Sequence, residues 1–233
     1  MNLELIGDAG SQLAKIHLGN GEAAKIENGA MVYMQDVKLE GKLNSSKKGL
    51  GGLLGAIGRS LVSNESMFIT QVVGTAPEGV VAIAPSVPGK IAKLEVGAKQ
   101  YRLNDGAFFA CDDSVNYKMQ KQNISQAVFG GSGGLFVMET EGQGDLLISA
   151  FGDLVELECT PAKPITIDNE HVVAWDASLN YSIEVASGTF GFTTGEGLVN
   201  KFTGNGKILI QTRNIHSLAD AVKPFLPDKS DGD

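Results

Sequence analysis

Cysteine, histidine and tryptophan are scarce in this chain of 233 residues. Its two cysteines, Cys111 and Cys159, are too few for a disulfide framework, and their spacing matches neither CxxC nor a metal-ligand motif. Both lie in apolar, strand-like stretches, which indicates buried free thiols. The three histidines, His17, His171 and His216, form no HxH, HxxxH or HExxH pattern. We therefore expect no metal, no cofactor and no catalytic residues.

Several sequence motifs of enzymes and membrane proteins are also missing. The chain contains neither the phosphate-binding pattern GxxxxGK[ST] nor the nucleophile pattern GxSxG. No run approaches the roughly 20 apolar residues that span a bilayer, and the first residues do not resemble a signal peptide. These absences predict a non-enzymatic protein of the cytoplasm.

Positive charge is in short supply, because 19 Lys and Arg stand against 27 Asp and Glu, giving a formal net charge of −8. An acidic surface repels phosphate backbones, so nucleic acid is an unlikely partner. A local basic patch would have to overcome that repulsion. The only candidate patch consists of Lys38, Lys42, Lys47, Lys48 and Arg59.

A short motif occurs three times in the chain. Each copy has an apolar residue, a polar turn and a run of apolar or small residues, and the copies span 26–34, 103–111 and 167–175. Two of the turns are Asn-Gly or Asp-Gly, which is a strong hairpin signal. In the first copy both faces of the strand are apolar, which predicts that it is covered on both sides.

A second motif follows the first each time. It opens with Gly79, Gly144 or Gly206 and continues as a strand, and another strand-like run precedes each glycine. We therefore expect two hairpins in every repeat, one at each motif. Residues 1 to 20 read as a further hairpin, and the best helix-forming stretch is 217–223.

The repeats predict an all-β, single-domain protein over 1–223, with units at about 21–84, 101–149 and 165–212. Because one unit of this size could not bury its apolar face alone, we expect a closed pseudo-threefold body of the β-barrel or double-stranded β-helix type. Residues 224–233 read as a flexible acidic tail. Trp175, the only tryptophan, falls at a repeat position that we assign to core packing.

The first unit has extra residues between its two motifs, in the glycine-rich and leucine-rich stretch 47–61. Its apolar residues are spaced as on one face of a helix, but its five glycines each cost about 1 kcal/mol in a helix. The stretch would therefore need a surface to fold against. That surface could be the protein itself, a second subunit or a membrane. The predicted interaction surface comprises Leu50, Leu53, Leu54, Ile57, Arg59 and Leu61.

The chain resembles the bacterial branch of the mitochondrial biogenesis, or altered inheritance of mitochondria, family. The resemblance covers about residues 3 to 215 and rests on glycine and apolar patterns at 51–59, 88–91, 107–110 and 133–136. It implies a fold similar to that of the tryptophan RNA-binding attenuation protein, with three such units in one chain. It brings no activity and no catalytic residues. Yeast relatives are associated with the mitochondrial inner membrane.

These observations together predict a non-enzymatic binding or scaffold protein. We expect it to form a homo-oligomer, with room for a protein partner or for peripheral contact with a membrane through 49–61 and its glycine-rich counterparts. Two alternatives stay open. One is a metal-dependent or small-ligand enzyme with its site on the pseudo-threefold axis, and the other is a nucleic-acid-binding protein, which the charge disfavours.

Overall fold

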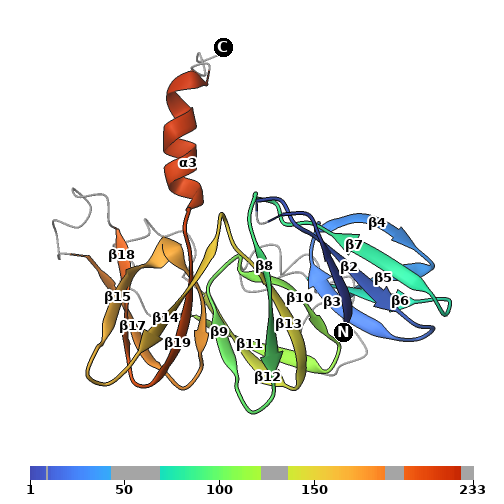
Figure 1. The fold of residues 1–233 in the computed structure, drawn as a ribbon, viewed down its shortest axis with the longest axis horizontal. Helices are drawn as coiled ribbons and strands as arrows, with labels where there is room; N and C mark the ends of the chain where they lie inside the picture. The colour runs from blue at the N-terminus through green and yellow to red at the C-terminus, as the bar shows by residue number, and fades with distance from the viewer. Residues whose placement is uncertain (9, 43–68, 122–135, 187–196, 227–233) are drawn as a thin grey trace, which may run out of the picture.

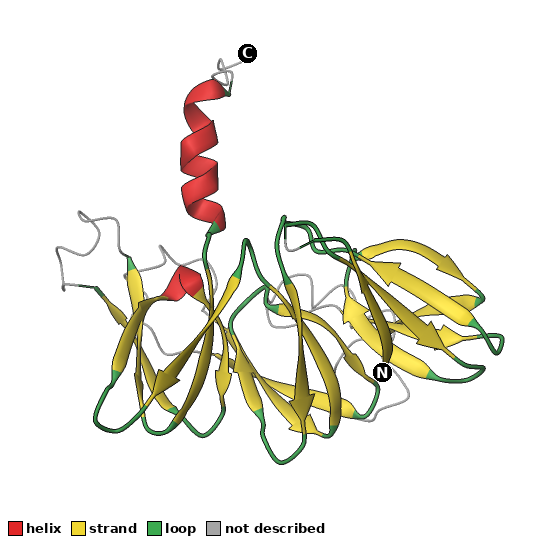
Figure 2. Cartoon of the chain, viewed as in Figure 1, coloured by secondary structure: helices red, strands yellow, loops and turns green. Residues whose placement is uncertain are grey.

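The computed structural model describes residues 1–8, 10–42, 69–121, 136–186 and 197–226. The fold is all-β, as the sequence predicts, and it consists of antiparallel sheets with one short α-helix (Figure 2). The sheets follow one another along the longest axis of the molecule, with the N-terminal strands at one end and β15, β17 and β18 at the other (Figure 1).

The strands of the described ranges form four sheets. The first has four strands: β1 (Asn2–Ile6), β2 (Leu13–Leu18), β7 (Gly79–Ile83) and β4 (Met31–Gln35). The second has six strands: β5 (Val37–Lys42), β6 (Ile69–Gly74), β3 (Ala23–Glu27), β10 (Phe108–Asp112), β13 (Gly144–Ser149) and β8 (Ile91–Val96).

The other two sheets lie in the C-terminal half. The third has six strands: β11 (Val115–Lys121), β12 (Phe136–Gly142), β9 (Tyr101–Leu103), β16 (Val172–Asp176), β19 (Gly206–Gln211) and β14 (Leu154–Cys159). The fourth has three strands: β15 (Ile165–Asp168), β18 (Leu198–Thr203) and β17 (Asn180–Val185).

One pattern of strand pairing recurs along the chain. The strands of the first motif pair with those of the second motif, as β4 with β7, β10 with β13 and β16 with β19. All three pairs shift register at the same place, after Met31, Phe108 and Val172. We call β2–β7, β8–β13 and β14–β19 the first, second and third units.

Neighbouring units are joined through shared sheets. We call β3, β9 and β15 the forward strands, and β4, β10 and β16 the receiving strands. The forward strand β3 pairs with the receiving strand β10 of the second unit, and β9 pairs in the same way with β16 of the third. Each six-stranded sheet therefore combines three strands of one unit with three strands of the next.

The prediction of a closed barrel is wrong, because no closed barrel forms among the strands of the described ranges. The units follow one another in an open row (Figure 1). The three-stranded sheet at one end contains the forward strand β15, and the four-stranded sheet at the other end contains the receiving strand β4. Each of these two strands lies at an edge of its sheet.

The predicted hairpins at the two motifs are also wrong. Asn28-Gly29 connects β3 to β4, and these strands belong to different sheets. Gly29 has a φ of +82°, so a turn is present as predicted, but the chain crosses from one sheet to the other there. The hairpin predicted over residues 1 to 20 is confirmed, since β1 pairs with β2 from Asn2 opposite His17 onward.

The core forms where the sheets face each other. β2 alternates between buried and half-buried residues, which is the pattern of a sheet with one covered face, whereas all five residues of β16 are buried. Trp175 is 1% exposed and lies edge-on to the rings of Tyr181 and Phe202 at 5.0 and 5.4 Å. Its assignment to core packing is confirmed.

The C-terminal helix α3 (Ile215–Val222) projects from the row of sheets (Figures 1 and 2). The Asn214 side chain caps it by accepting the N–H of Ser217 at 2.7 Å. The predicted helix at 217–223 is thus confirmed, but it begins two residues earlier and ends one residue earlier. Short 3-10 turns occupy η2 (Asn169–His171) and η4 (Lys223–Phe225). No helix in the described ranges is long and apolar enough to cross a membrane.

Candidate functional site

The receiving strand β4 is an exposed apolar edge. Met31, Val32, Tyr33 and Met34 are 39 to 53% exposed. The corresponding residues of β10 and β16 are apolar as well, and none of them is more than 3% exposed: Phe108, Phe109, Ala110, Cys111, Val172, Val173, Ala174 and Trp175. The first unit therefore keeps a core-like sequence on a strand that is exposed among the described residues.

The difference in burial follows from the pairing of the strands. β10 lies between β13 and the forward strand β3, and β16 lies between β19 and the forward strand β9. β4 pairs with β7 on one side, and no described strand pairs with its other side. The prediction that both faces of β4 are covered is therefore not met among the described residues. An exposed apolar edge of this kind is a template for adding another strand.

The forward strand β15 is the matching edge at the other end of the row. It pairs with β18 from Ile165 opposite Phe202 to Asp168 opposite Val199, and its other side faces no described strand. Thr166 is exposed on this strand, whereas the side chain of Ile167 packs into the third core cluster. Figure 1 shows β15 and β4 at opposite ends of the molecule.

A cation on each inner forward strand ties two units together. Lys25 of β3 donates from Nζ to the carbonyl oxygens of Asp113 and Val115 at 2.8 and 2.7 Å. Arg102 takes the corresponding place on β9, where Nη1 donates to the carbonyl of Leu179 at 3.0 Å. These charge-assisted bonds fasten the turn after each receiving strand to the preceding unit.

We call the pairing of β3 with β10 the first joint and the pairing of β9 with β16 the second joint. Arg102 has further partners at the second joint. Its Nε atom lies 2.6 Å from a carboxylate oxygen of Glu139, and its guanidinium carbon lies 5.3 Å from the centre of the Tyr181 ring. The corresponding residue on β15 is Thr166. A strand paired to β15 would therefore lack the charge-assisted hydrogen bonds that stabilise the pairing at β3 and β9.

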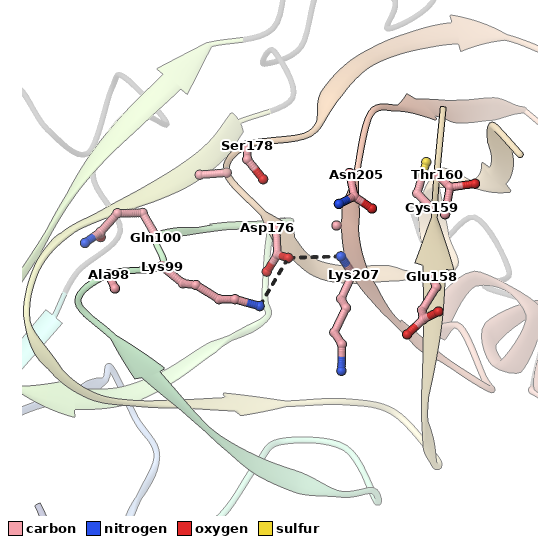
Figure 3. A pocket seen from close by; sticks show the side chains of 12 residues that line it. Ala98, Lys99, Gln100, Glu158, Cys159, Thr160, Asp176, Ser178, Asn205 and Lys207 are labelled. Atoms are coloured by element: carbon pink, nitrogen blue, oxygen red, sulfur yellow. Dashed lines mark hydrogen bonds and ion pairs between the residues drawn. The ribbon is translucent and has the colours of Figure 1, made fainter. Parts of the chain in front are cut away.

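A hollow of about 590 Å³ lies beside the second joint (Figure 3). Asp176 accepts the backbone N–H of Lys207 at 3.0 Å and lies 3.6 Å from Nζ of Lys99. Asp112 accepts the N–H of Asp145 at 2.7 Å in the equivalent place of the second unit. These carboxylates therefore act as structural acceptors that hold the second motif against the first.

A second hollow, of about 400 Å³, lies where α3 leaves the third unit. Nδ1 of His216 lies 2.7 Å from a carboxylate oxygen of Glu170, and Nδ1 of His171 lies 2.7 Å from the carbonyl oxygen of Gln211. His171 is partly buried and hydrogen-bonded, as a structural histidine is, and His17 lies on β2 in the first unit. The three histidines do not converge. The described ranges contain no group of three His, Cys, Asp or Glu that could hold a metal ion.

The predicted surface formed by Leu50, Leu53, Leu54, Ile57, Arg59 and Leu61 lies outside the described residues. Its place in the topology is nevertheless defined, because it connects the paired strands β5 and β6. The glycine-rich stretches 122–135 and 187–196 connect the equivalent pairs, β11 with β12 and β17 with β18. The β4 edge was not among the predicted site residues. Its signal was the run of apolar residues on both faces.

Burial shifts the pKa of the buried Cys111 and of the half-buried Glu27. Burial raises the pKa of the Cys111 thiol to about 12. Cys111 is therefore protonated at neutral pH, and both it and Cys159 are buried free thiols, as predicted. Burial also raises the pKa of the Glu27 carboxyl at the end of the forward strand β3. Neither group lies in a constellation that would use it as a nucleophile or a base.

Comparison with known proteins places this architecture in a family. A family model described as "Mitochondrial biogenesis AIM24" matches residues 3–213. An uncharacterized protein of Streptococcus pyogenes serotype M6 is 50% identical over 220 residues, covering 94% of this chain and 88% of that protein. A crystal structure of a Streptococcus pyogenes protein is 46% identical and has a TM-score of 0.81, with 97% of this chain and 99% of that chain covered. The chain belongs to the AIM24 mitochondrial biogenesis family.

Proposed function

We propose that this protein is a non-enzymatic scaffold that works as a homo-oligomer. One observation carries the proposal: the receiving strand β4 presents Met31 to Met34 to solvent, whereas the same positions of the other two units are buried. Large exposed apolar patches on soluble proteins mark contacts with another macromolecule. An open strand edge with such side chains offers both backbone hydrogen bonds and apolar area to a second chain.

The three units make the protein suitable as a scaffold. The sequence predicts a pseudo-threefold arrangement, and the recurring strand pairs support it. In each unit a glycine-rich connection leaves the same pair of strands. A homo-oligomer would thus present many copies of these glycine-rich connections in one assembly. Several weak contacts made by one assembly bind a partner far more tightly than a single contact does. The likeness to the tryptophan RNA-binding attenuation protein stays a prediction from the sequence.

The glycine-rich and leucine-rich segment 47–61 is the element we propose for contact with a further protein or with the surface of a membrane. Its apolar spacing and its flanking cations support this role. The proposal includes a cytoplasmic location with peripheral attachment.

The native mass of the purified full chain tests self-association. Light scattering after gel filtration, repeated over a hundredfold range of protein concentration, should give a mass well above the 24.5 kDa of one chain. The apparent mass should fall on dilution if the contact is reversible. A single species of one chain at every concentration would contradict the proposed homo-oligomer.

A further inference from the structure

The two ends of the row are halves of one missing sheet. Each inner six-stranded sheet combines a set of three strands ending in a forward strand with a set of three beginning at a receiving strand. β17, β18 and β15 form the first kind of set, and β4, β7 and β2 form the second. Joining them would give the order β17-β18-β15-β4-β7-β2, which repeats the order of both inner sheets, with β1 as an additional strand beyond β2.

We infer that copies of this protein join head to tail, with β15 of one copy pairing antiparallel to β4 of the next. This inference rests on the proposed self-association and names the surfaces that perform it. The two edges lie at opposite ends of one chain (Figure 1), so the pairing is between chains. Each copy has both a free β4 edge and a free β15 edge among its described strands, so each copy can pair with one neighbour at each end.

The inner joints fix the register of the new joint. Ala110 lies opposite Ile26 and Cys111 opposite Lys25 at the first joint. Ala174 lies opposite Leu103 and Trp175 opposite Arg102 at the second. Both joints thus use the same positions of the repeated motif. The corresponding pairs between two copies are Tyr33 with Ile167, Met34 with Thr166 and Gln35 with Ile165.

The burial of the equivalent residues in β10 and β16 supports a second copy as the partner of β4. The side chains that β3 and β9 cover on their receiving strands are apolar, and β4 keeps that character over Met31–Met34. A one-residue slip would turn each side chain to the opposite face, so the covered residues hold the strands in this register. A second copy is thus an occupant whose complementary edge, β15, is found among the described strands.

The new joint is weaker than the two inner joints. Lys25 and Arg102 fasten those joints through carbonyl oxygens of the following turn, and Thr166 replaces them on β15. The chains can therefore separate on dilution while each chain stays folded. Because the two surfaces differ, the contact is heterologous: it closes into a ring if successive rotations add up to a full turn, and otherwise it extends as a filament.

Disulfide trapping with single-cysteine additions tests this joint. Met34→Cys is made in one preparation and Thr166→Cys in another, since both positions are exposed in the lone chain. Directly opposed residues of antiparallel strands have Cα atoms about 4.5 to 5.5 Å apart, which is within the range of a disulfide. The native Cys111 and Cys159 are buried and remain as they are.

Mixing the two preparations under mild oxidation should give a covalent dimer with one chain of each kind, whereas neither preparation alone should give more than a trace. A mixture of Met34→Cys with Glu184→Cys, whose side chain lies on the exposed face of β17, is the matched control and should stay monomeric on a denaturing gel. A chain carrying both Met34→Cys and Thr166→Cys should form covalent oligomers.

The outcomes separate this inference from the proposed function. If native mass shows an oligomer but Met34→Cys links only to itself, the contact is twofold symmetric and the head-to-tail joint is overturned, while self-association stands. If native mass shows one chain and no mixture links, both fall. If the Glu184→Cys mixture links as readily as the Thr166→Cys mixture, the trapping reflects random collision and the register is overturned.

Discussion

At the scale of single residues, the glycine that opens the second motif is required by close contact. A Cβ atom on Gly79 would lie 2.6 Å from the carbonyl oxygen of Asp36 and 2.8 Å from that of Leu18. Backbone atoms at such distances cannot be avoided by a change of rotamer. This explains why the sequence places glycine at the start of β7 after a turn.

Gly79→Ala is therefore expected to lower the free energy of unfolding by about 1–3 kcal/mol. Urea unfolding followed by tryptophan fluorescence measures this change. Gly10→Ala is the matched control, because a Cβ there meets nothing within 4 Å, and it should change stability by less than about 0.5 kcal/mol. Equal stability of the two variants would contradict the close contact at Gly79.

Glu27 predicts a pH dependence. Burial raises its pKa in the folded protein, so the folded state binds this proton more tightly than the unfolded state. Its contribution to stability is therefore full at low pH, below the unfolded value, and is lost as the pH rises through the folded value. Glu27→Gln should raise the free energy of unfolding at pH 7 and give no such gain at about pH 3.5. A gain of the same size at both pH values would disprove the burial effect.

The two cysteines provide a simple test of the core. Cys111 and Cys159 are buried, and the pKa of Cys111 is about 12 because of that burial. A reagent whose absorbance changes when it reacts with a thiol should detect no fast-reacting cysteine in the folded protein at pH 8. In guanidinium chloride it should detect two cysteines per chain. One thiol that reacts at once under native conditions would show that the packing around it is open.

The residues also show what sequence can establish. Burial of the two thiols and of Trp175 follows from apolar surroundings and is confirmed. The sequence does not predict the roles of Lys25 and Arg102, because their partners are backbone carbonyl oxygens 77 to 90 residues away along the chain. A hydrogen bond to a distant backbone atom leaves no pattern in the local sequence.

At the scale of secondary structure elements, the strands were predicted better than their partners. Alternating and apolar runs located β3, β4 and the strands that open at Gly79, Gly144 and Gly206. The Asn-Gly and Asp-Gly turns predict pairing of the strands on either side of each turn. In the structure, the two strands at each turn belong to different sheets. A glycine in the left-handed conformation turns the chain both in a hairpin and in a crossing between two sheets, so the dipeptide does not distinguish the two connections.

Segment 47–61 carries the prediction of contact with lipid. Wild-type protein should float with vesicles that contain anionic lipid, and Leu53→Asp should not, because a carboxylate on the apolar face opposes insertion. Ser45→Asp is the control: it adds the same charge outside the apolar spacing and should leave flotation intact. If all three proteins remain at the bottom of the gradient, the proposed contact of this segment with lipid is wrong.

The forward edge offers a gain-of-function test. Thr166→Lys restores on β15 the cation that Lys25 provides on β3. It should strengthen association of the chains, seen as a higher mass at a given low concentration, because a charge-assisted bond to carbonyl oxygens would be added to the joint. Thr203→Lys, on the neighbouring strand β18, supplies the same charge elsewhere and should not. Weaker association of Thr166→Lys would argue against the proposed register.

At the scale of the whole molecule, the all-β class is confirmed and the closed barrel is wrong. The sequence shows that a single unit cannot bury its own apolar face, and that physical reasoning led to a closed body. The structure meets the requirement by sharing sheets between neighbours, and among the described strands this leaves the receiving strand β4 and the forward strand β15 without the partner that their equivalents have. Whether a row of units closes depends on the rotation between them, and no residue pattern encodes that rotation directly.

The measurement that tests the central claim most directly is sedimentation equilibrium of the wild type beside two lysine variants. Val32→Lys places a charge on the β4 edge, and Val155→Lys places the same charge on β14, which the joint does not use; both positions are exposed in the lone chain. We expect Val32→Lys to sediment as a folded single chain with unchanged thermal stability, while the wild type and Val155→Lys associate. Association of Val32→Lys as strong as that of the wild type would contradict a scaffold assembled through β4.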